Sequence, residues 1–349
     1  LSYFQIGLLL SIPGIISSSI EPFIGILADL GKRKVLILTG GVIFAASLVI
    51  TSLSTGFVVL LLSFILFYPA SGAFVSLSQT ALMDANPSRR EKNMARWTFV
   101  GSLGVVCGPI FLGLTNILGL GWRGAFLGSA VITVPLIVFA QRLGKQISSE
   151  QSHQQAGLMS GLMDALGALR RREVLRWLVL LEFSDLMLDV LLGFLALYFV
   201  DVAGATPQQA GVAVAIWSGA GLLGDFLLIP LLDKVSGLSY LRASALLELV
   251  LLPAFLLMPN LNTKLVLLGL LGFFNAGWYA ILKANLYEVL PGRSGTALAL
   301  NNITGLLGGF LPIILGWVAQ RYNLQLTMWF LLFGPLALIV GIPYSWERR

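Results

Sequence analysis

The sequence predicts an all-α polytopic membrane protein, and three observations lead to this fold class. The 349-residue chain is 57% hydrophobic and 11% charged, and its mean hydropathy of +0.90 lies far above that of a soluble globular domain. Apolar runs long enough to cross a hydrocarbon core of about 30 Å follow one another almost without pause. These runs are much longer than the roughly ten residues of a membrane β-strand, so we expect helices.

We expect eleven spans, each an apolar run bounded by charged or polar loops. They run roughly over residues 3–28, 35–53, 57–83, 97–118, 122–141, 174–200, 208–232, 240–258, 264–290, 295–319 and 324–345. Between the fifth and sixth lies a polar stretch, 142–157, that contains no span. It is followed by leucines at helical spacing, Leu158, Leu162, Leu166 and Leu169, which predict an amphipathic helix on the membrane face.

The polar stretch divides the expected protein into an N-terminal helical bundle (1–141), a cytoplasmic linker with the amphipathic helix (142–173) and a C-terminal helical bundle (174–349).

The positive charges fix the expected orientation. Of the 22 Lys and Arg residues, 18 fall in alternate loops, the linker and the C-terminal tail, whereas the opposite side holds only Arg123, Lys264 and Arg321. By the positive-inside rule the rich side is cytoplasmic, which places the C-terminus inside and predicts a multi-pass protein of the cell membrane, of a bacterial inner-membrane type.

The composition argues against several classes of function. The net charge of +6 follows from membrane topology and needs no nucleic-acid partner. The one cysteine, Cys107, lies within a span, and the one histidine, His153, lies in the linker, so neither a metal site nor a nucleophilic constellation is expected. We therefore expect no enzyme and no cofactor, but a monomer in the lipid bilayer. A pair of carboxylates could catalyse a reaction without histidine, so the composition argues against a membrane enzyme but does not exclude one.

The chain matches itself at an offset of 204 residues. Matching residues include Gln5 and Gln209, Gly7 and Gly211, Glu21 and Asp225, Asp29 and Asp233, Pro87 and Pro291, Arg89 and Arg293, Gly101 and Gly305, and Gly104 and Gly308. Both copies cross the membrane in the same direction, so the repeat is parallel, as in the two halves of a 6+6 transporter. The second half has a span, 174–200, that the first half lacks. We therefore expect a twelve-span plan without its first span.

One loop makes the resemblance to a known family specific. The segment Gly25-Ile-Leu-Ala-Asp29-Leu-Gly31-Lys32-Arg33-Lys34 resembles the hallmark loop of the major facilitator superfamily, G-x-x-x-D-[RK]-x-G-[RK]-[RK], although Leu30 replaces a basic residue and Gly31 falls one place early. A degenerate copy surrounds Asp233. The resemblance implies a two-bundle 6+6 fold, alternating access and a small-molecule substrate.

The physical logic of this loop predicts a gating latch. Gly25 lets a neighbouring helix approach closely, and Asp29 at a helix end can accept hydrogen bonds from the positive N-terminus of a neighbour. In the superfamily that neighbour is the eleventh helix, which here begins near Ser294 and Gly295. We assign Arg33, Asp233, Glu21 and Asp225 to the same gating group. The alternative is a cluster of charges that serves only to orient the protein in the membrane.

A second motif lies in the span 97–118. Gly104, Gly108, Pro109 and Gly113, with Gly101, resemble the G-x-x-x-G-P-x-x-G-G signature of antiporters in this superfamily, with Leu112 in place of one glycine. Glycines and a proline allow tight helix packing and a kink. The motif favours proton-coupled export of a small organic molecule, and an ordinary small-residue interface is the alternative.

Ionisable residues inside spans are the candidate substrate and proton-coupling residues, because charge in hydrocarbon is costly without function or pairing. These are Glu182, Asp185 and Asp189 in one span and Lys283 in another, where Asn275, Trp278 and Tyr279 join it as candidates. At 100° per residue the three acids share an arc of about 60°. We expect Glu182 to pair with Lys283 and Asp185 or Asp189 to carry the proton; a static ion pair is the alternative. A substrate–proton importer and a non-transporting receptor or scaffold remain open.

Overall fold

The computed structural model describes residues 3–142, 163, 167–291, 293–308 and 311–343, and within these ranges every regular element is a helix. The predicted amphipathic helix falls mostly on residues 143–162 and 164–166, which lie outside the described part of the chain. The chain forms two compact units, and each unit combines segments from both halves of the sequence. The predicted division into bundles at the linker stays a prediction.

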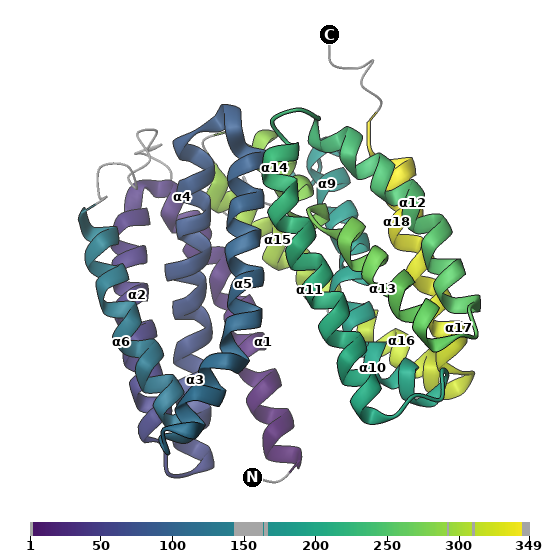
Figure 1. Ribbon diagram of the computed structural model, residues 1–349. Helices are drawn as coiled ribbons and strands as arrows, with labels where there is room; N and C mark the ends of the chain where they lie inside the picture. Colours follow the sequence, from purple (N-terminus) through teal and green to yellow (C-terminus); the bar gives the residue numbers. More distant parts are fainter. Residues whose placement is uncertain (1–2, 143–162, 164–166, 292, 309–310, 344–349) are drawn as a thin grey trace. The chain divides into compact units, whose positions relative to one another are not determined.

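Unit 1 comprises Leu1–Ser88, Cys107–Val174 and Tyr287–Leu306. Its elements are α1 (Tyr3–Leu27), the turn η1 (Ala28–Lys32), α2 (Arg33–Leu53), α3 (Phe57–Ser71), the widened turn η2 (Gly72–Ser76), α4 (Leu77–Ala85), the short η3 (Pro87–Arg89), the second part of α5 (Arg90–Ile117), α6 (Gly121–Arg142) and most of α15 (Ser294–Gly308). In Figure 1, α6 runs alongside α2, which is its most extensive packing partner.

Unit 2 comprises Arg89–Val106, Leu175–Leu286 and Leu307–Arg349. It contains the first part of α5, nearly all of α9 (Arg172–Asp185), the widened turn η4 (Leu186–Val190), α10 (Leu191–Asp201), α11 (Pro207–Leu231), α12 (Gly237–Leu257), α13 (Leu261–Asn275), most of α14 (Trp278–Glu288), α16 (Leu311–Arg321), α17 (Leu324–Trp329), η5 (Phe330–Leu332) and α18 (Phe333–Gly341). The helix α13 packs between α11 and α12, and α12 also contacts α18 (Figure 1).

The helices follow the predicted spans closely, and eight stretches are long and apolar enough to cross a membrane. One of them, Ile12–Leu53, joins two predicted spans across η1. Predicted spans 174–200 and 295–319 have no counterpart among the eight, and the second contains residues 309–310, outside the described ranges. The all-helical membrane fold is therefore confirmed, and the count of eleven spans stays a prediction.

The core of unit 1 forms where η2 packs against Gly40 and Gly41 of α2. Phe74 packs with Ile37, Leu77 and other buried apolar side chains. A Cβ added to Gly41 would lie 2.9 Å from the Phe74 ring, so the glycine leaves the space that the ring occupies. Close approach at small residues is the usual way in which helices associate in lipid, where no hydrophobic effect drives them together.

The core of unit 2 contains a buried lysine of α13 that caps the C-terminal end of α12. Lys264 is only 4% exposed, and its ammonium group donates to the Tyr198 hydroxyl (2.8 Å) and to the carbonyl oxygen of Phe255 (2.7 Å). Phe255 lies in the last turn of α12, whose final carbonyl groups have no partner within the helix. A cation there also interacts favourably with the negative end of the helix dipole. Lys264 therefore caps α12 from inside the bundle.

Candidate functional site

The gating candidates gather around a sharp turn in unit 1. The turn η1 reverses the chain between α1 and α2, and its Gly31 has φ of +85°, a backbone conformation that side chains other than glycine rarely adopt. Asp29 lies at the start of this turn and Arg33 at the first position of α2. The local chain reversal therefore holds an acid and a base four residues apart at one end of two helices.

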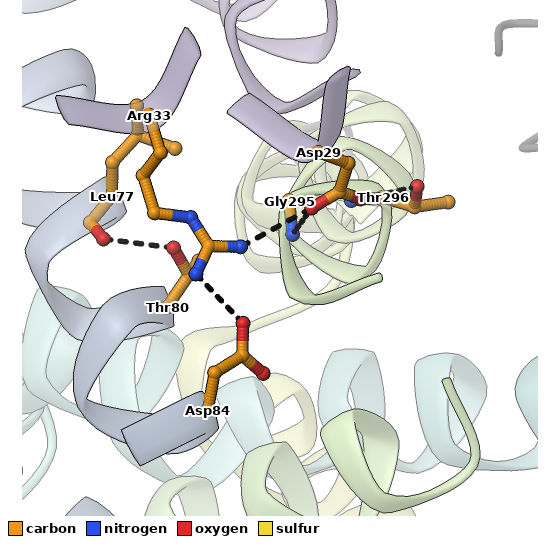
Figure 2. A network of polar contacts seen from close by, with 7 residues as sticks. All are labelled: Asp29, Arg33, Leu77, Thr80, Asp84, Gly295 and Thr296. Atoms are coloured by element: carbon orange, nitrogen blue, oxygen red, sulfur yellow. Dashed lines mark hydrogen bonds and ion pairs between the residues drawn. The ribbon is translucent and has the colours of Figure 1, made fainter. Parts of the chain in front are cut away.

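Asp29 binds the N-terminus of α15. Its carboxylate accepts hydrogen bonds from the backbone N–H groups of Gly295 (2.9 Å) and Thr296 (2.6 Å) and from the Thr296 hydroxyl (2.7 Å) (Figure 2). The first N–H groups of a helix have no partner within it, and the dipole favours a negative charge there. The hydrogen bond that the sequence predicted is present, and its role as a gate stays a prediction.

Arg33 extends this contact to a third helix. One nitrogen of its guanidinium lies 2.7 Å from the Asp84 carboxylate, at the end of α4, and another lies 3.3 Å from Asp29. The Arg33 residue is 1% exposed, so the two ion pairs are largely shielded from solvent. Figure 2 shows Asp84, Arg33, Asp29 and Thr296 as one continuous polar network. We name these four residues, with Gly295, the Asp29 network.

Gly25 makes the approach of α15 possible. A Cβ built on Gly25 would overlap the carbonyl oxygen of Gly295, and a Cβ built on Gly295 would overlap that of Gly25. The two backbones thus meet at reciprocal glycines one turn away from the carboxylate. Any larger residue at either position would push α15 away from Asp29.

The repeat-related copy in unit 2 is weaker. Asp233, the counterpart of Asp29, accepts from the Lys92 ammonium at 2.6 Å, and Lys92 is itself the counterpart of Thr296. The Asp233 side chain is 56% exposed, against 11% for Asp29, so solvent screens its ion pair. A second contact accompanies it, from the Gly237 N–H to the Glu91 carboxylate at 3.1 Å.

The second pair of repeat-related acids lies deeper in the helices. In unit 1, Glu21 accepts hydrogen bonds from Ser17 (2.6 Å) and from the amide of Asn302 in α15 (2.7 Å). A Cβ on Gly72, at the start of η2, would lie 2.6 Å from the Glu21 carboxyl carbon. Glu21 thus connects α1, η2 and α15.

Asp225 occupies the equivalent position in unit 2. It is 6% exposed, accepts a hydrogen bond from Ser102 of α5 (2.7 Å) and interacts with the backbone amide of Gly277. The carboxylate lines a cavity of about 180 Å³, together with Trp217, Asn275 and Tyr279. We name this space the Asp225 cavity.

The three predicted acids of residues 174–200 do not share one regular helix. Glu182 and Asp185 are half-buried residues of α9, 60° apart in projection, and both have interaction partners. Asp189 lies beyond Asp185 in the widened turn η4, and the common arc of the three acids stays a prediction. The side chain of Asp189 lies outside the described part of the structure, and the proton-coupling role of these acids stays a prediction.

The second group of predicted site residues is split by a break in the helix. The chain leaves helical geometry at Ala276 and Gly277, where Gly277 has φ of +80°, between α13 and α14. Asn275 and Tyr279 nevertheless line the Asp225 cavity together. Trp278 is fully buried, and its indole N–H donates to the Ser244 hydroxyl at 2.9 Å, so it packs inside the bundle.

Lys283 is also buried, at 1% exposure, with its ammonium nitrogen 5.7 Å from the centroid of the Tyr279 ring. Glu182 and Lys283 both lie in unit 2, and their predicted ion pair stays a prediction.

The glycine motif of α5 is placed differently from what close packing requires. Among the described residues, a Cβ at Gly104, Gly108 or Gly113 would meet no atom within 4 Å. The helix-packing role of this motif, with Pro109, stays a prediction.

Sequence reasoning missed several polar residues. Glu248, in α12, is fully buried, and its position as the one acid inside an apolar helix was an available signal. Lys264 was expected at the outer end of the span 264–290, but its side chain is buried inside the bundle. Ser102 and Asn302 gave no signal, because a hydroxyl or an amide in a span becomes notable only when its partner is known.

Within the described residues, the fold is a bundle of apolar helices, and no group of three or more His, Cys, Asp or Glu residues could hold a metal ion. Polar networks cross between the helices. The apolar helices and the polar contacts between them define the class: a polytopic helical membrane protein.

Comparison with known proteins gives the family. The model of the Major Facilitator Superfamily matches residues 1–311. The chain belongs to this superfamily, and it is a transporter rather than an enzyme.

Solved structures agree on the fold. FucP in the outward conformation is 18% identical, with a TM-score of 0.78, and the match covers 100% of this chain and 91% of FucP. The proton:xylose symporter XylE is 16% identical, with a TM-score of 0.68 and coverage of 100% and 87%. The human organic anion transporter MFSD10 is 20% identical, with a TM-score of 0.69 and coverage of 97% and 83%. At these identities the likeness establishes the fold alone.

Proposed function

We propose that the protein is a proton-coupled secondary transporter that exports a small organic molecule by alternating access. The observation that carries the proposal is the Asp29 network. It joins α1, α2 and α4 from the first half of the sequence to α15 from the second, through hydrogen bonds that can break and re-form. A contact of this kind can hold one side of a transporter closed while the other side is open.

Acidic side chains within the helices support coupling to protons. Glu182, Asp185 and Asp225 lie on α9 and α11 of unit 2, and Asp225 lines a cavity that also presents the aromatic rings of Trp217 and Tyr279. Carboxylates inside membrane helices are characteristic of proton relays and ion pathways. Aromatic rings beside a carboxylate suit an amphipathic organic cation, whereas the buried Lys283 suits an organic anion or a polar metabolite.

The direction of export rests on the glycine and proline motif of α5, which resembles the antiporter signature. Proton symport into the cell is the second candidate. It is favoured by the solved structures with similar folds, because the Escherichia coli protein FucP is a fucose:proton symporter and XylE is a proton:xylose symporter. The two mechanisms differ in one measurable quantity, the sign of the proton gradient that drives accumulation of the substrate.

The test begins with a thermal-shift screen of the full-length protein against organic cations, organic anions and sugars. Ligands that raise the melting temperature are then offered to proteoliposomes with an imposed proton gradient. Antiport predicts accumulation in vesicles that are acidic inside, and symport predicts accumulation in vesicles that are acidic outside. Binding without accumulation under either gradient would contradict transport and favour a receptor.

The proton-coupling residues are tested in the same vesicles. We expect Asp185→Asn or Asp189→Asn to abolish gradient-driven accumulation while preserving exchange of labelled for unlabelled substrate, because exchange needs no net proton movement. Asp201→Asn, at the exposed end of α10, is the matched control. Undiminished gradient-driven flux in both variants would remove these two acids from the mechanism.

A further inference from the structure

Two buried polar side chains in unit 2 lack hydrogen-bond partners. Glu248, in the middle of α12, is 0% exposed, and neither of its carboxylate oxygens makes a hydrogen bond within the described part of the chain. Asn275, the last residue of α13, is 1% exposed, and its amide oxygen and nitrogen are likewise without partners. The two side chains lie next to each other and interact, but no pair of their atoms has the distance and angles of a hydrogen bond. Buried polar groups are almost always satisfied, so four such atoms together indicate a site that binds something.

Asn275 connects this pair to the Asp225 cavity. Asn275 lines the cavity and also neighbours Glu248, which itself is absent from the lining. The break in the helix directly follows Asn275, and the Tyr240 hydroxyl stabilises it by donating to the carbonyl oxygen of Ala276 at 2.9 Å. The amide thus lies at the end of α13, where the helix no longer constrains the backbone on its C-terminal side.

The charged groups around Glu248 are few. Tyr240 of α12 lies within electrostatic reach of both Glu248 and Asp225 of α11. Lys264 of α13 interacts with Phe255, two helical turns further along α12. The described segments α17 and α18, which also pack against α12, contain no ionisable side chain. Arg242, on α12 itself, donates to the carbonyl oxygen of Ile342, and the Lys283 ammonium of α14 lies near the Tyr279 ring. Among the described residues no cation donates to the Glu248 carboxyl group.

We propose that Glu248 and Asn275 form a proton-binding site that is loaded from the Asp225 cavity. A proton added to one Glu248 oxygen gives a neutral carboxyl group, whose O–H donates to the Asn275 amide oxygen. The Asn275 amide N–H then donates to the other Glu248 oxygen. This reciprocal pair satisfies both carboxyl oxygens and the amide oxygen, and it leaves no net charge in the apolar interior, where an ion without a partner is very costly.

A metal cation fits the same site less well. Na⁺ requires several oxygen ligands, whereas the pair offers two carboxylate oxygens and one amide oxygen. The carbonyl oxygens of Phe274 and Ala276 beside it already accept from Tyr240. A proton requires a single oxygen, so the donor set favours it.

Infrared spectroscopy of the purified full-length protein in lipid tests the site without any substrate. A neutral buried carboxyl group has its own C=O stretching band, which shifts in D₂O. We expect this band in the wild type at neutral pH and its loss in Glu248→Gln. The matched control is Glu173→Gln, which removes an exposed acid of α9 and should leave the band in place. A band that persists unchanged in Glu248→Gln would overturn the proposal.

A second variant protects the test against misfolding of the first. Asn275→Leu removes the amide partner, so the carboxyl band should shift to the higher frequency of a carbonyl group that accepts no hydrogen bond. No shift would overturn the pairing. A band change produced by Na⁺ at constant pH would also overturn it and indicate a metal cation instead.

The coupling role of the site rests on the proposed function, but the infrared result does not. If the protein transports by proton coupling, Glu248→Gln should lose gradient-driven accumulation and retain substrate exchange. A protein that shows no transport at all would contradict the proposed function and leave the infrared assignment standing. Intact gradient-driven transport in Glu248→Gln would remove Glu248 from coupling.

Discussion

Asp29→Asn tests the proposed latch most directly. The Asp29 carboxylate accepts three hydrogen bonds from Gly295 and Thr296 and lies beside the Arg33 guanidinium. Asparagine keeps one acceptor oxygen, but it loses the charge and presents an N–H₂ group where the second oxygen accepted from Thr296. Hydrogen bonds to charged groups contribute about 1.5–3 kcal/mol each. We therefore expect the contact between Asp29 and α15 to weaken by about 3 kcal/mol.

That loss is large enough to measure as a change of population. Because 1.4 kcal/mol corresponds to a factor of ten, about 3 kcal/mol shifts the closed–open equilibrium roughly a hundredfold. A closed fraction of about 99% would fall to about one half. The distance between spin labels at the exposed positions Lys32 and Pro291, both in unit 1, reports the state on a Cys107→Ser background. We expect a second, longer distance to appear in Asp29→Asn.

Asp233→Asn is the matched control, because the repeat gives Asp233 the same place in unit 2 with an exposed ion pair in place of a buried network. We expect this variant to leave the distance distribution between the labels in unit 1 unchanged. A distribution for Asp29→Asn that matches the wild type would refute the reasoning, since the carboxylate would then not hold α15 in place.

Three further predictions concern packing and charge. Gly25→Val should lower the melting temperature, because its side chain would overlap the backbone of α15, whereas Gly14→Ala in the same helix meets no atom within 4 Å and should not; equal losses would contradict the close approach. Lys264→Met should destabilise the protein by about 1–3 kcal/mol in chemical denaturation, because buried carbonyl oxygens lose their donor; an unchanged free energy of unfolding would contradict the cap. The hydrogen bond from Lys92, with the positive charges nearby, lowers the pKa of Asp233 below its ordinary value of 3.8. A lowered pKa stabilises the fold above the usual Asp range, and this contribution is lost as the pH falls through the lowered pKa, so Asp233→Asn should match the wild type in melting temperature only in strong acid.

The helices and their ends could be predicted from the sequence because apolar length and charged loops determine them. The type of partner of Asp29 could also be predicted, since a carboxylate at a helix end suits the N-terminus of a neighbour, and the resemblance to the superfamily indicated which helix that is. The breaks at η2, η4 and Gly277 could not, because the hydrophobic pattern continues across them without interruption. Such breaks depend on tertiary contacts that satisfy the freed backbone groups, and a linear pattern does not contain these contacts.

The interior polar residues show the same limit. The sequence predicts Lys264 at the start of a span, but it does not show that the long side chain reaches the carbonyl groups of α12. Glu248 was visible as an acid in an apolar run. Its neighbour Asn275 was assigned to a continuous helical face with Tyr279, because nothing in the sequence shows that the helix ends between them.

The repeat helps to explain why Glu21 and Asp225 differ. Each acid lies where a helix of its sequence half is irregular, at Gly72 between α3 and α4 and at Gly277 between α13 and α14, and the offset of 204 residues places the counterpart of Gly72 directly before Gly277. Glutamate has one methylene more than aspartate, and Glu21 lies against Gly72 while η2 remains helical. The shorter Asp225 interacts with the backbone of Gly277, where the helix is broken outright. A shorter side chain thus accompanies the larger distortion, and that distortion places Asn275 at a helix end beside Glu248. The first half carries Phe44 and Ser71 at the positions equivalent to Glu248 and Asn275, so within the described residues the unpartnered pair occurs only in unit 2.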